Sequence, residues 1–400
     1  MEPSSAFKSG CVLTSILNRM PLNSLRSHGG QSKESFASGG SSAAPPGINS
    51  RERYSRQVLF SAIGEQGQVR LSLGHAAIVG VGATGAAAAS LLARAGVGRL
   101  TLIDRDFVEP SNLQRQVLFD ESDARQCLPK AEAAYRHLRA INADVKITPH
   151  VADLVPGNAE ELLAGADLVL DGTDNFETRY LLNDLCVRDG CPWIYTAAVG
   201  SYAATMNILP RPADAFSPPS WRERAEPTAC LACLFAAAPT GEVESCETAG
   251  VLGTAVNLAA SIAVTEALKF LSGQAGAMRR TLISHDLWTG ERSEVAAGNP
   301  RSSCTVCGRR EFRALSGEAR PHITLCGRNS VQIHEHGRPM DLAQLERRLS
   351  PLGEVRANGL LLRFRYRTYT LTIFPDGRAL VQGTTDVGLA RSLYARFVGT

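Results

Sequence analysis

From Tyr54 onward, the chain alternates short apolar runs with longer segments whose apolar positions recur every three or four residues. Short apolar runs are typical of strands buried in a parallel sheet, and the longer segments are typical of the crossover helices between them. The predicted strands are HAAIVGV (75–81), RLTLID (99–104), DLVLDGTD (167–174) and PWIYTAAV (192–199). The pattern therefore predicts an α/β fold with a doubly wound, mostly parallel sheet.

The second half of this region predicts an added antiparallel portion. A helix is expected over 176–189, and ATMNILP (204–210) follows the last parallel strand closely enough to be a further strand. A long apolar helix is expected within 250–272. TLISHDL (281–287) and RSEVAA (292–297) then look like closing strands.

Residues 309–321 are polar and predict a linker to a small α+β unit. Three domains are therefore expected, namely a tail over 1–50, a main domain over 51–310 and a C-terminal domain over 321–400. The last contains strand-like HITLCGRNSVQIHE, helical DLAQLERRLSPLG, the alternating run GLLLRFRYRTYTLTIFPDGRALVQG and helical DVGLARSLYARF.

The first fifty residues are rich in Ser and Gly and have few apolar residues to offset the entropy of ordering, so we predict disorder. The same composition, poor in acids and containing Arg, also resembles organelle transit peptides, and Met20 is an alternative start. No apolar core of a secretory signal is evident.

Composition argues against several classes of protein. A net charge of +3 from 42 basic and 39 acidic residues predicts no extended surface for nucleic acid or membrane. Gly, Arg and Thr interrupt the Ala-rich stretches, so no membrane-spanning helix is expected. Ten cysteines are too few for a disulfide scaffold in 400 residues, which favours a reducing, cytoplasmic location.

A glycine-rich turn follows the first predicted strand. In Gly80-x-Gly82-x-x-Gly85, between a strand and a helix, glycines allow the backbone to approach phosphate in a Rossmann-like sheet. Asp104 ends the next strand, where an acid usually binds ribose hydroxyls. The pattern predicts a nucleotide site, and the alternative is a tight turn with close helix packing.

The segment DRDFVEPSNLQRQVLF distinguishes between kinds of nucleotide enzyme. It contains Asp106, Asn112, Arg115 and Gln116, and Lys130 follows on the next helix. A dehydrogenase does not need several cations beside a pyrophosphate, whereas cleavage of a triphosphate needs charge at the leaving group. Each cation alone is also compatible with a solvated surface.

Two cysteine pairs have the spacing of metal ligands. Cys230 and Cys233, and Cys304 and Cys307, could each occupy two corners of a tetrahedron, which predicts a structural zinc site without an open position. The alternative is two redox dithiols, although no thioredoxin-like unit lies near them.

Eight sequence blocks carry a family resemblance. Their order and approximate spacing over residues 51–310 resemble the ThiF/MoeB/HesA family of carrier-protein adenylyltransferases, relatives of ubiquitin-activating enzymes. The blocks are RYSRQ (53–57), GVGATG, AGVGRLTLIDRDFVEPSNLQRQ, PKAEAA, DGTDN (171–175), CLAC, CETAGVLG and CTVC. Where family members commonly have GxGGxG, this chain has Ala83 and Thr84 in the middle.

The resemblance implies an activity. The C-terminal Gly-Gly carboxylate of a small ubiquitin-like carrier, similar to ThiS or MoaD, would attack the α-phosphate of ATP and release pyrophosphate. This carboxylate is ionised at neutral pH, so no general base is needed. The acyl-adenylate would serve sulfur transfer in thiamine or molybdopterin biosynthesis. Sulfur would come from a separate cysteine desulfurase or rhodanese, since no rhodanese loop follows residue 310.

The resemblance also implies roles for the site residues and a homodimer, with Mg²⁺, ATP and structural Zn²⁺ as bound groups. Asp104 would bind ribose and Asp174 would hold Mg²⁺, while Arg56 would enter the neighbouring subunit's site. Phosphate binding would fall to Arg115 and Lys130, with Asn112 and Asp106 beside them.

Two further cysteines stay open as expectations. Cys246, in SCETAGVLG, occupies the position of a reactive cysteine in family members that proceed beyond adenylation, but Glu244 and Glu247 beside it would oppose ionisation. Cys326 lies in LCGRNSVQI, which resembles a C-terminal extension of some bacterial ThiF-like proteins. We expect Cys326 to be a buried strand residue.

Other functions are compatible with parts of the pattern. A relative that activates a modified tRNA base, similar to threonylcarbamoyladenosine dehydratase, is disfavoured by the near-neutral charge and the four cysteines. An inactive scaffold that docks the carrier is disfavoured because Arg56, Arg115, Lys130 and Asp174 are all present. A dehydrogenase is disfavoured because no catalytic His or Tyr-Lys pair is evident.

Overall fold

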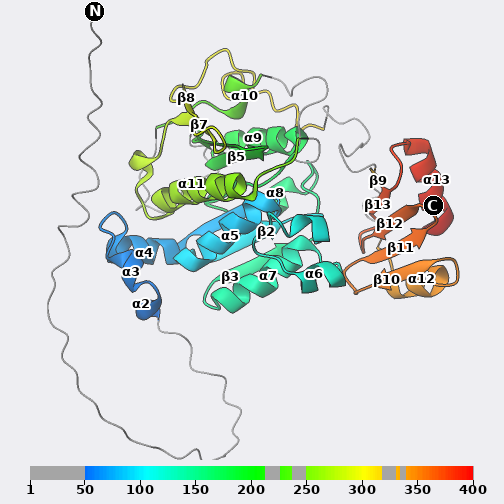
Figure 1. The fold of residues 1–400 in the computed structure, drawn as a ribbon. Helices are drawn as coiled ribbons and strands as arrows, with labels where there is room; N and C mark the ends of the chain where they lie inside the picture. Colours follow the sequence, from blue (N-terminus) through cyan, green and yellow to red (C-terminus); the bar gives the residue numbers. More distant parts are fainter. Residues whose placement is uncertain (1–49, 212–225, 237–248, 318–329, 334–338, 400) are drawn as a thin grey trace, which may run out of the picture. The chain divides into compact units, whose positions relative to one another are not determined.

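The computed structural model describes residues 50–211, 226–236, 249–317, 330–333 and 339–399 (Figure 1). The predicted disorder of residues 1–50 falls almost entirely outside these ranges, and Cys246 and Cys326 lie outside them as well.

An eight-stranded sheet organises the first part, in the order β3-β2-β1-β4-β5-β6-β7-β8. The strands from β3 to β5 pair in parallel, and β6 to β8 are added antiparallel. Their bounds are β1 His75–Val79, β2 Arg99–Ile103, β3 Lys146–His150, β4 Leu168–Asp171, β5 Trp193–Val199, β6 Tyr202–Ile208, β7 Thr281–Asp286 and β8 Arg292–Ala296. The predicted α/β fold with an antiparallel extension is confirmed.

Helices cover both faces of this sheet. Along β1, Ala76 and Ile78 contribute to a core with α5, α7 and α11, whereas Ala77 and Val79 contribute to a second core with α9. The principal helices are α5 Ala83–Ala95, α7 Lys130–Ile141, α9 Phe176–Asp189 and α11 Gly253–Leu271. Shorter helices are α2 Ser50–Arg53, α3 Ser55–Val58, α4 Gly64–Leu73, α6 Glu121–Gln126, α8 Ala159–Leu162 and α10 Leu231–Leu234. The sheet is therefore doubly wound.

Helix α11 bears on the expectation that no membrane-spanning helix is present. Its 19 residues are long and apolar enough on average to cross a membrane, although polar residues interrupt the apolar run in the sequence. More than half of this stretch is buried, and α11 packs against α5, β5 and β6. Figure 1 shows α11 and α5 side by side. These contacts are those of a core helix.

A five-stranded antiparallel sheet forms the C-terminal domain, in the order β10-β11-β12-β13-β9. Its core includes Phe364, Leu371, Leu345 and Phe397. The elements are β9 Ser330–Ile333, α12 Leu342–Leu349, β10 Glu354–Ala357, β11 Leu362–Tyr366, β12 Tyr369–Ile373, β13 Ala379–Gln382 and α13 Val387–Phe397. Asn49 to Thr400 is one compact unit by its contacts, so this domain belongs to the same body as the first sheet.

The stretch predicted as a polar linker is more than a linker in its described part. Phe312, Ala314 and Leu315 pack against the core that contains α9. The buried carboxylate of Asp184 accepts hydrogen bonds from the amides of Ala314 and Leu315, at 2.8 and 3.4 Å. These contacts attach residues 312–315 to the core around α9.

Candidate functional site

The glycine-rich turn lies between β1 and α5, at the carboxyl edge of the sheet. Gly80 has φ +81°, a conformation that favours glycine, and a Cβ atom at Gly85 would collide with the carbonyl oxygen of Gly80. Gly80 and Gly85 are therefore required by the protein's own backbone packing.

Gly82 has a different environment. A Cβ atom placed there would meet only the Nε2 atom of Gln116, at 3.8 Å. Gly82 caps α5, whose first amides point away from the helix body and offer hydrogen-bond donors to an anion. Among the described residues no other atom lies within 4 Å of this position, so the space beside Gly82 is open to a ligand.

Asp104 fixes the turn from the neighbouring strand. Its Oδ2 atom accepts a hydrogen bond from the amide of Val81 at 2.6 Å, and its Oδ1 atom accepts one from the amide of Asp106 at 2.7 Å. Burial raises the pKa of Asp104, and the positive charge of Lys130 opposes this rise. The carboxylate is thus preorganised, and each oxygen keeps acceptor capacity for a ligand hydroxyl.

Lys130 and Asp106 form a nearly buried ion pair. The Nζ atom of Lys130 lies 3.1 Å from Oδ2 of Asp106, and the lysine side chain is only 4% exposed. The amide of Lys130 also donates to the carbonyl of Asp106 at 2.8 Å. The beginning of α7 is therefore tied to the segment after β2, and the charge of the ammonium group acts on the Asp104 carboxylate.

The polar segment after Asp106 contains Asn112, which holds the local backbone, and Arg115, whose charge is open to a ligand. Asn112 is buried, and its Oδ1 atom accepts from the amide of Glu109 at 3.0 Å. Arg115 is half-buried, and its Nη1 atom donates to the carbonyl of Ser111 at 2.8 Å. No ion pair of Arg115 is found within the described parts of the chain, so its charge is available to a ligand.

A buried arginine shapes the loop after β4. The Nε atom of Arg179 lies 3.0 Å from Oδ2 of Asp171, and Nη2 donates to the carbonyls of Thr173 and Thr196 at 2.6 and 2.9 Å. Burial raises the pKa of Asp171, while the Arg179 charge opposes this rise. The neighbouring Asp174 is exposed and makes no hydrogen bond or ion pair among the described residues.

Arg105 connects the acids electrostatically. Burial lowers the pKa of Arg105, but the charges of Asp153, Asp106, Asp174 and Asp104 outweigh it, and the net pKa is raised. Asp174 therefore lies within electrostatic reach of the same guanidinium group as Asp104 and Asp106. Since β1 and β4 are adjacent with helices on opposite faces, this is the edge where doubly wound sheets bind ligands.

Arg56 lies apart, on the short helix α3. It is exposed, and no contact of its guanidinium group with another described residue is found. The preceding Tyr54 is anchored, because its hydroxyl accepts a hydrogen bond from Nδ2 of Asn142 at 2.8 Å. Helix α3 is thus held in place while Arg56 projects to solvent.

The four predicted metal ligands do converge. Sulfur distances are 3.9 Å for Cys230 to Cys233, 3.6 Å for Cys230 to Cys304 and 3.3 Å for Cys233 to Cys307. A tetrahedral zinc ion with Zn–S bonds of about 2.3 Å separates its sulfurs by about 3.8 Å. Hydrogen bonds from Cys230 and then Cys307 lower the pKa of Cys233 to about 2. The donor set fits Zn²⁺.

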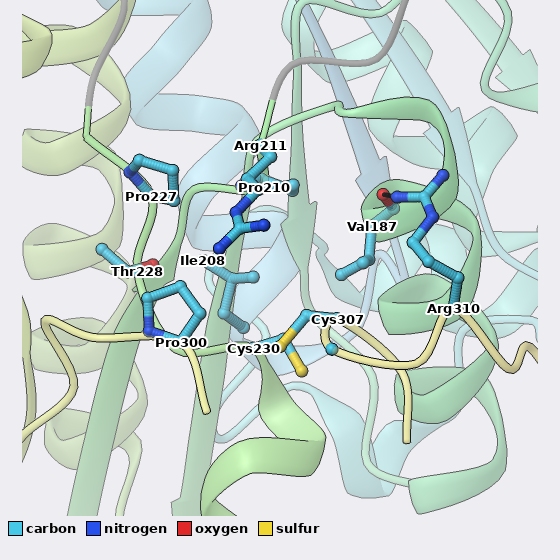
Figure 2. Close-up of a pocket in the computed structure, with 11 residues that line it drawn as sticks. Val187, Ile208, Pro210, Arg211, Pro227, Thr228, Cys230, Pro300, Cys307 and Arg310 are labelled. Atoms are coloured by element: carbon cyan, nitrogen blue, oxygen red, sulfur yellow. Dashed lines mark hydrogen bonds between the residues drawn. The ribbon is translucent and has the colours of Figure 1, made fainter. Parts of the chain in front are cut away.

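A cavity of about 130 Å³ adjoins this cluster (Figure 2). Cys230 and Cys307 lie side by side in it, with Arg211 and Arg310 among the other lining residues. None of the predicted nucleotide-site residues lines this cavity. It belongs to the cysteine cluster and is separate from the glycine-rich turn.

Comparison with protein families decides the classification. The model of the ThiF family matches residues 54–306, well over half of the chain. The chain belongs to the ThiF family.

Curated relatives of this ThiF protein include adenylyltransferases. The sulfur carrier protein ThiS adenylyltransferase of Bacillus subtilis is 43% identical over 351 residues, which cover 87% of this chain and 99% of the relative. The SAMP-activating enzyme E1 of Haloferax volcanii is 36% identical over 258 residues, 64% of this chain and 88% of that enzyme. The crystal structure of E. coli MccB with ATP has a TM-score of 0.53 at 23% identity, over 65% of this chain and 75% of MccB, which shows a shared fold.

Sequence reasoning missed two supporting residues of the ThiF protein's candidate site, Arg105 and Arg179, which hold the acidic loops. It named Gln116 without a position, and the structure buries Gln116 beside Gly82, with no hydrogen-bond partner for its Oε1 atom among the described residues. Gln116 was visible as a polar residue in a polar run, but the sequence did not reveal that it faces the turn. Arg179 follows Asp171 by eight residues, and only the strand-to-helix turn brings them together.

A pair of glycine substitutions separates ligand space from backbone packing. Gly82→Val should leave the melting temperature nearly unchanged and weaken ATP-analogue binding by at least about tenfold, because the side chain would occupy the phosphate space. Gly85→Ala should lower the melting temperature by several degrees because of overpacking. Calorimetry and thermal unfolding measure both, and normal ATP binding by Gly82→Val would place the phosphates elsewhere.

Proposed function

We propose that this ThiF protein adenylates the C-terminal carboxylate of a ThiS-like sulfur carrier with ATP, for thiamine biosynthesis. The observation that carries the proposal is the 43% identity with the Bacillus subtilis ThiS adenylyltransferase. That similarity extends over 99% of the relative and 87% of this chain, so it is longer than the matched ThiF segment. The geometry of the nucleotide site supports the same reaction.

The chain's own residues account for binding and orientation. Gly82 and the first amides of α5 would hold the phosphates, and the Asp104 carboxylate would accept a ribose hydroxyl. Arg115 and Lys130 would stabilise the charge that develops on the departing pyrophosphate. An oxygen of the carrier's carboxylate would form a bond to the α-phosphorus of ATP. The bond between the α-phosphorus and the oxygen that bridges to the β-phosphorus would break and release pyrophosphate, and no proton is transferred.

Asp174 is the residue that we assign to Mg²⁺. Its carboxylate is exposed, unlike Asp171, which is held by Arg179. Mg²⁺ prefers oxygen ligands and usually binds through one or two carboxylates together with substrate phosphates. When bound, it would neutralise phosphate charge during displacement.

A homodimer is part of this proposal. Arg56 is exposed on an anchored helix, which suits a side chain that reaches into the site of a second copy. Leu59 and Phe60 next to it are 73% and 62% exposed, an apolar surface that a second copy would cover.

A MoaD-like carrier is the second candidate substrate. The adenylyltransferase and sulfurtransferase MOCS3 of Sus scrofa is 33% identical over 299 residues, 74% of this chain and 61% of that protein. In either pathway, a separate protein would donate the sulfur.

The decisive experiment is ATP–pyrophosphate exchange with purified ThiS-like and MoaD-like carriers. We expect exchange with the ThiS-like carrier and none when its last glycine is removed. Exchange without any carrier, or exchange that requires tRNA, would contradict the proposal. Complete inactivity together with tight carrier binding would instead support a docking scaffold.

Cys246 gives a separate prediction, since adenylation needs no thiol. Cys246→Ser should leave ATP–pyrophosphate exchange unchanged within about twofold. If Cys246 receives the acyl group or sulfur, formation of the carrier thiocarboxylate should be lost, as mass spectrometry of the carrier would measure. Loss of exchange itself would contradict the expected order of steps.

A further inference from the structure

A small apolar cluster joins the C-terminal domain to the ThiF domain. Phe107, Cys127 and Val151 come from the first domain, and they pack with Leu361, Phe374 and Leu380 of the second. Phe107 and Leu361 are only 2% and 1% exposed. The domains thus share a dry contact.

Arg363, on β11, contacts this cluster with a directed polar group. Its guanidinium group lies over the ring of Phe107, 4.9 Å from the centroid, and its Nη1 atom is 3.4 Å from the Sγ atom of Cys127. Nearby, Nδ2 of Asn358 donates to the carbonyls of Gln126 and Cys127, at 3.0 and 3.2 Å. These contacts hold the end of α6, where Cys127 has φ +50°.

Arg378 makes a second directed contact. It is 1% exposed, pairs with Asp376 and lies over the ring of Phe374. Its Nη2 atom donates to the carbonyl of Val151 at 3.1 Å. Arginine is suited to such positions, because its planar group can stack and donate several hydrogen bonds at once.

The contacted segments are those that carry the phosphate-site charges. Phe107 follows Asp106 directly and forms a β-bridge with Pro129, which precedes Lys130. On the other side, Val151 precedes Ala152, whose amide donates to the carbonyl of Asp104 at 3.2 Å. The C-terminal domain therefore contacts residues immediately next to Asp106 and Lys130.

We infer that the C-terminal domain positions the Asp106–Lys130 pair for ATP, through Arg363 and Arg378. The inference rests on the proposed function for the identity of the nucleotide. Both arginines are positioning residues. They contact Phe107, Cys127 and Val151, and no contact with Asp106 or Lys130 is found among the described residues. Their loss would let the segments 105–108 and 126–130 move, so the ammonium group would no longer be held at the phosphates.

The test compares Arg363→Gln with Arg365→Gln in the full-length protein. Arg365 lies two residues along the same strand, is exposed and makes no side-chain contact with the ThiF domain among the described residues, so it is a matched control. For Arg363→Gln we expect KM for ATP in pyrophosphate exchange to rise about 5- to 50-fold, while KM for the carrier stays within twofold. Arg365→Gln should change neither.

Two more measurements separate positioning from folding and from the proposed function. Arg378→Ala should raise KM for ATP, and Arg378→Lys should recover part of the loss, with melting temperatures measured for every variant. Calorimetry with a non-hydrolysable ATP analogue requires no carrier, so it tests the inference even where exchange fails. Unchanged ATP affinity in Arg363→Gln, or a rise confined to KM for the carrier, would overturn the inference.

Discussion

Asp174→Asn is expected to reduce ATP–pyrophosphate exchange by at least about a hundredfold, with the fold intact. The exposed Asp174 carboxylate makes no hydrogen bond or ion pair among the described residues, so its removal breaks no direct contact and only weakens its charge interaction with Arg105 and Arg179. An amide of the same shape would still accept hydrogen bonds, but it would lack the charge that holds Mg²⁺ between the phosphates. Exchange at several Mg²⁺ concentrations measures the effect, and excess Mg²⁺ should recover part of the activity.

A matched control for this variant is Glu161→Gln, which also neutralises an exposed carboxylate. It should retain full exchange and the same melting temperature. Full activity of Asp174→Asn would remove the basis for a metal at this loop.

The fold was predicted well from the sequence in the segments where burial determines the pattern of apolar and polar residues. β1, β2, β4 and β5 are covered on both faces, so each is a short apolar run that is visible without a structure. Helix α9 matches the predicted range 176–189, because Asn175 caps its first turn and Gly190 ends it. β3 was missed, since Pro149 and exposed residues weaken the pattern of this edge strand.

The candidate site was only partly predictable for a different reason. Local spacing in the sequence was enough to name the glycines, acids and cations that follow the strands as candidate site residues. The roles of Arg179, Arg105 and Gln116 depend on which loops meet in space. The contact of Arg363 with Phe107 joins positions 256 residues apart, and no local pattern encodes such a pairing.

Cys230→Ser is expected to release the metal and to lower the melting temperature by at least about 10 °C. Cys230 is buried, and its sulfur contacts those of Cys233 and Cys304. These ligands come from two segments 74 residues apart in sequence, so a bound zinc ion would act as a crosslink between them. Without the metal, the two cysteine segments would no longer be held together against the core around α9.

Metal content and thermal unfolding of the purified protein test this expectation together. Cys191→Ser is the matched control, because Cys191 is also buried in the core around α9 but lies outside the four-cysteine cluster. It should keep one zinc ion per chain and lose only a few degrees, as a small buried substitution does. A chelator should lower the melting temperature of the unmodified protein to that of Cys230→Ser. A metal-free Cys230→Ser protein with an unchanged melting curve would show that the four thiols do not support the fold through a metal.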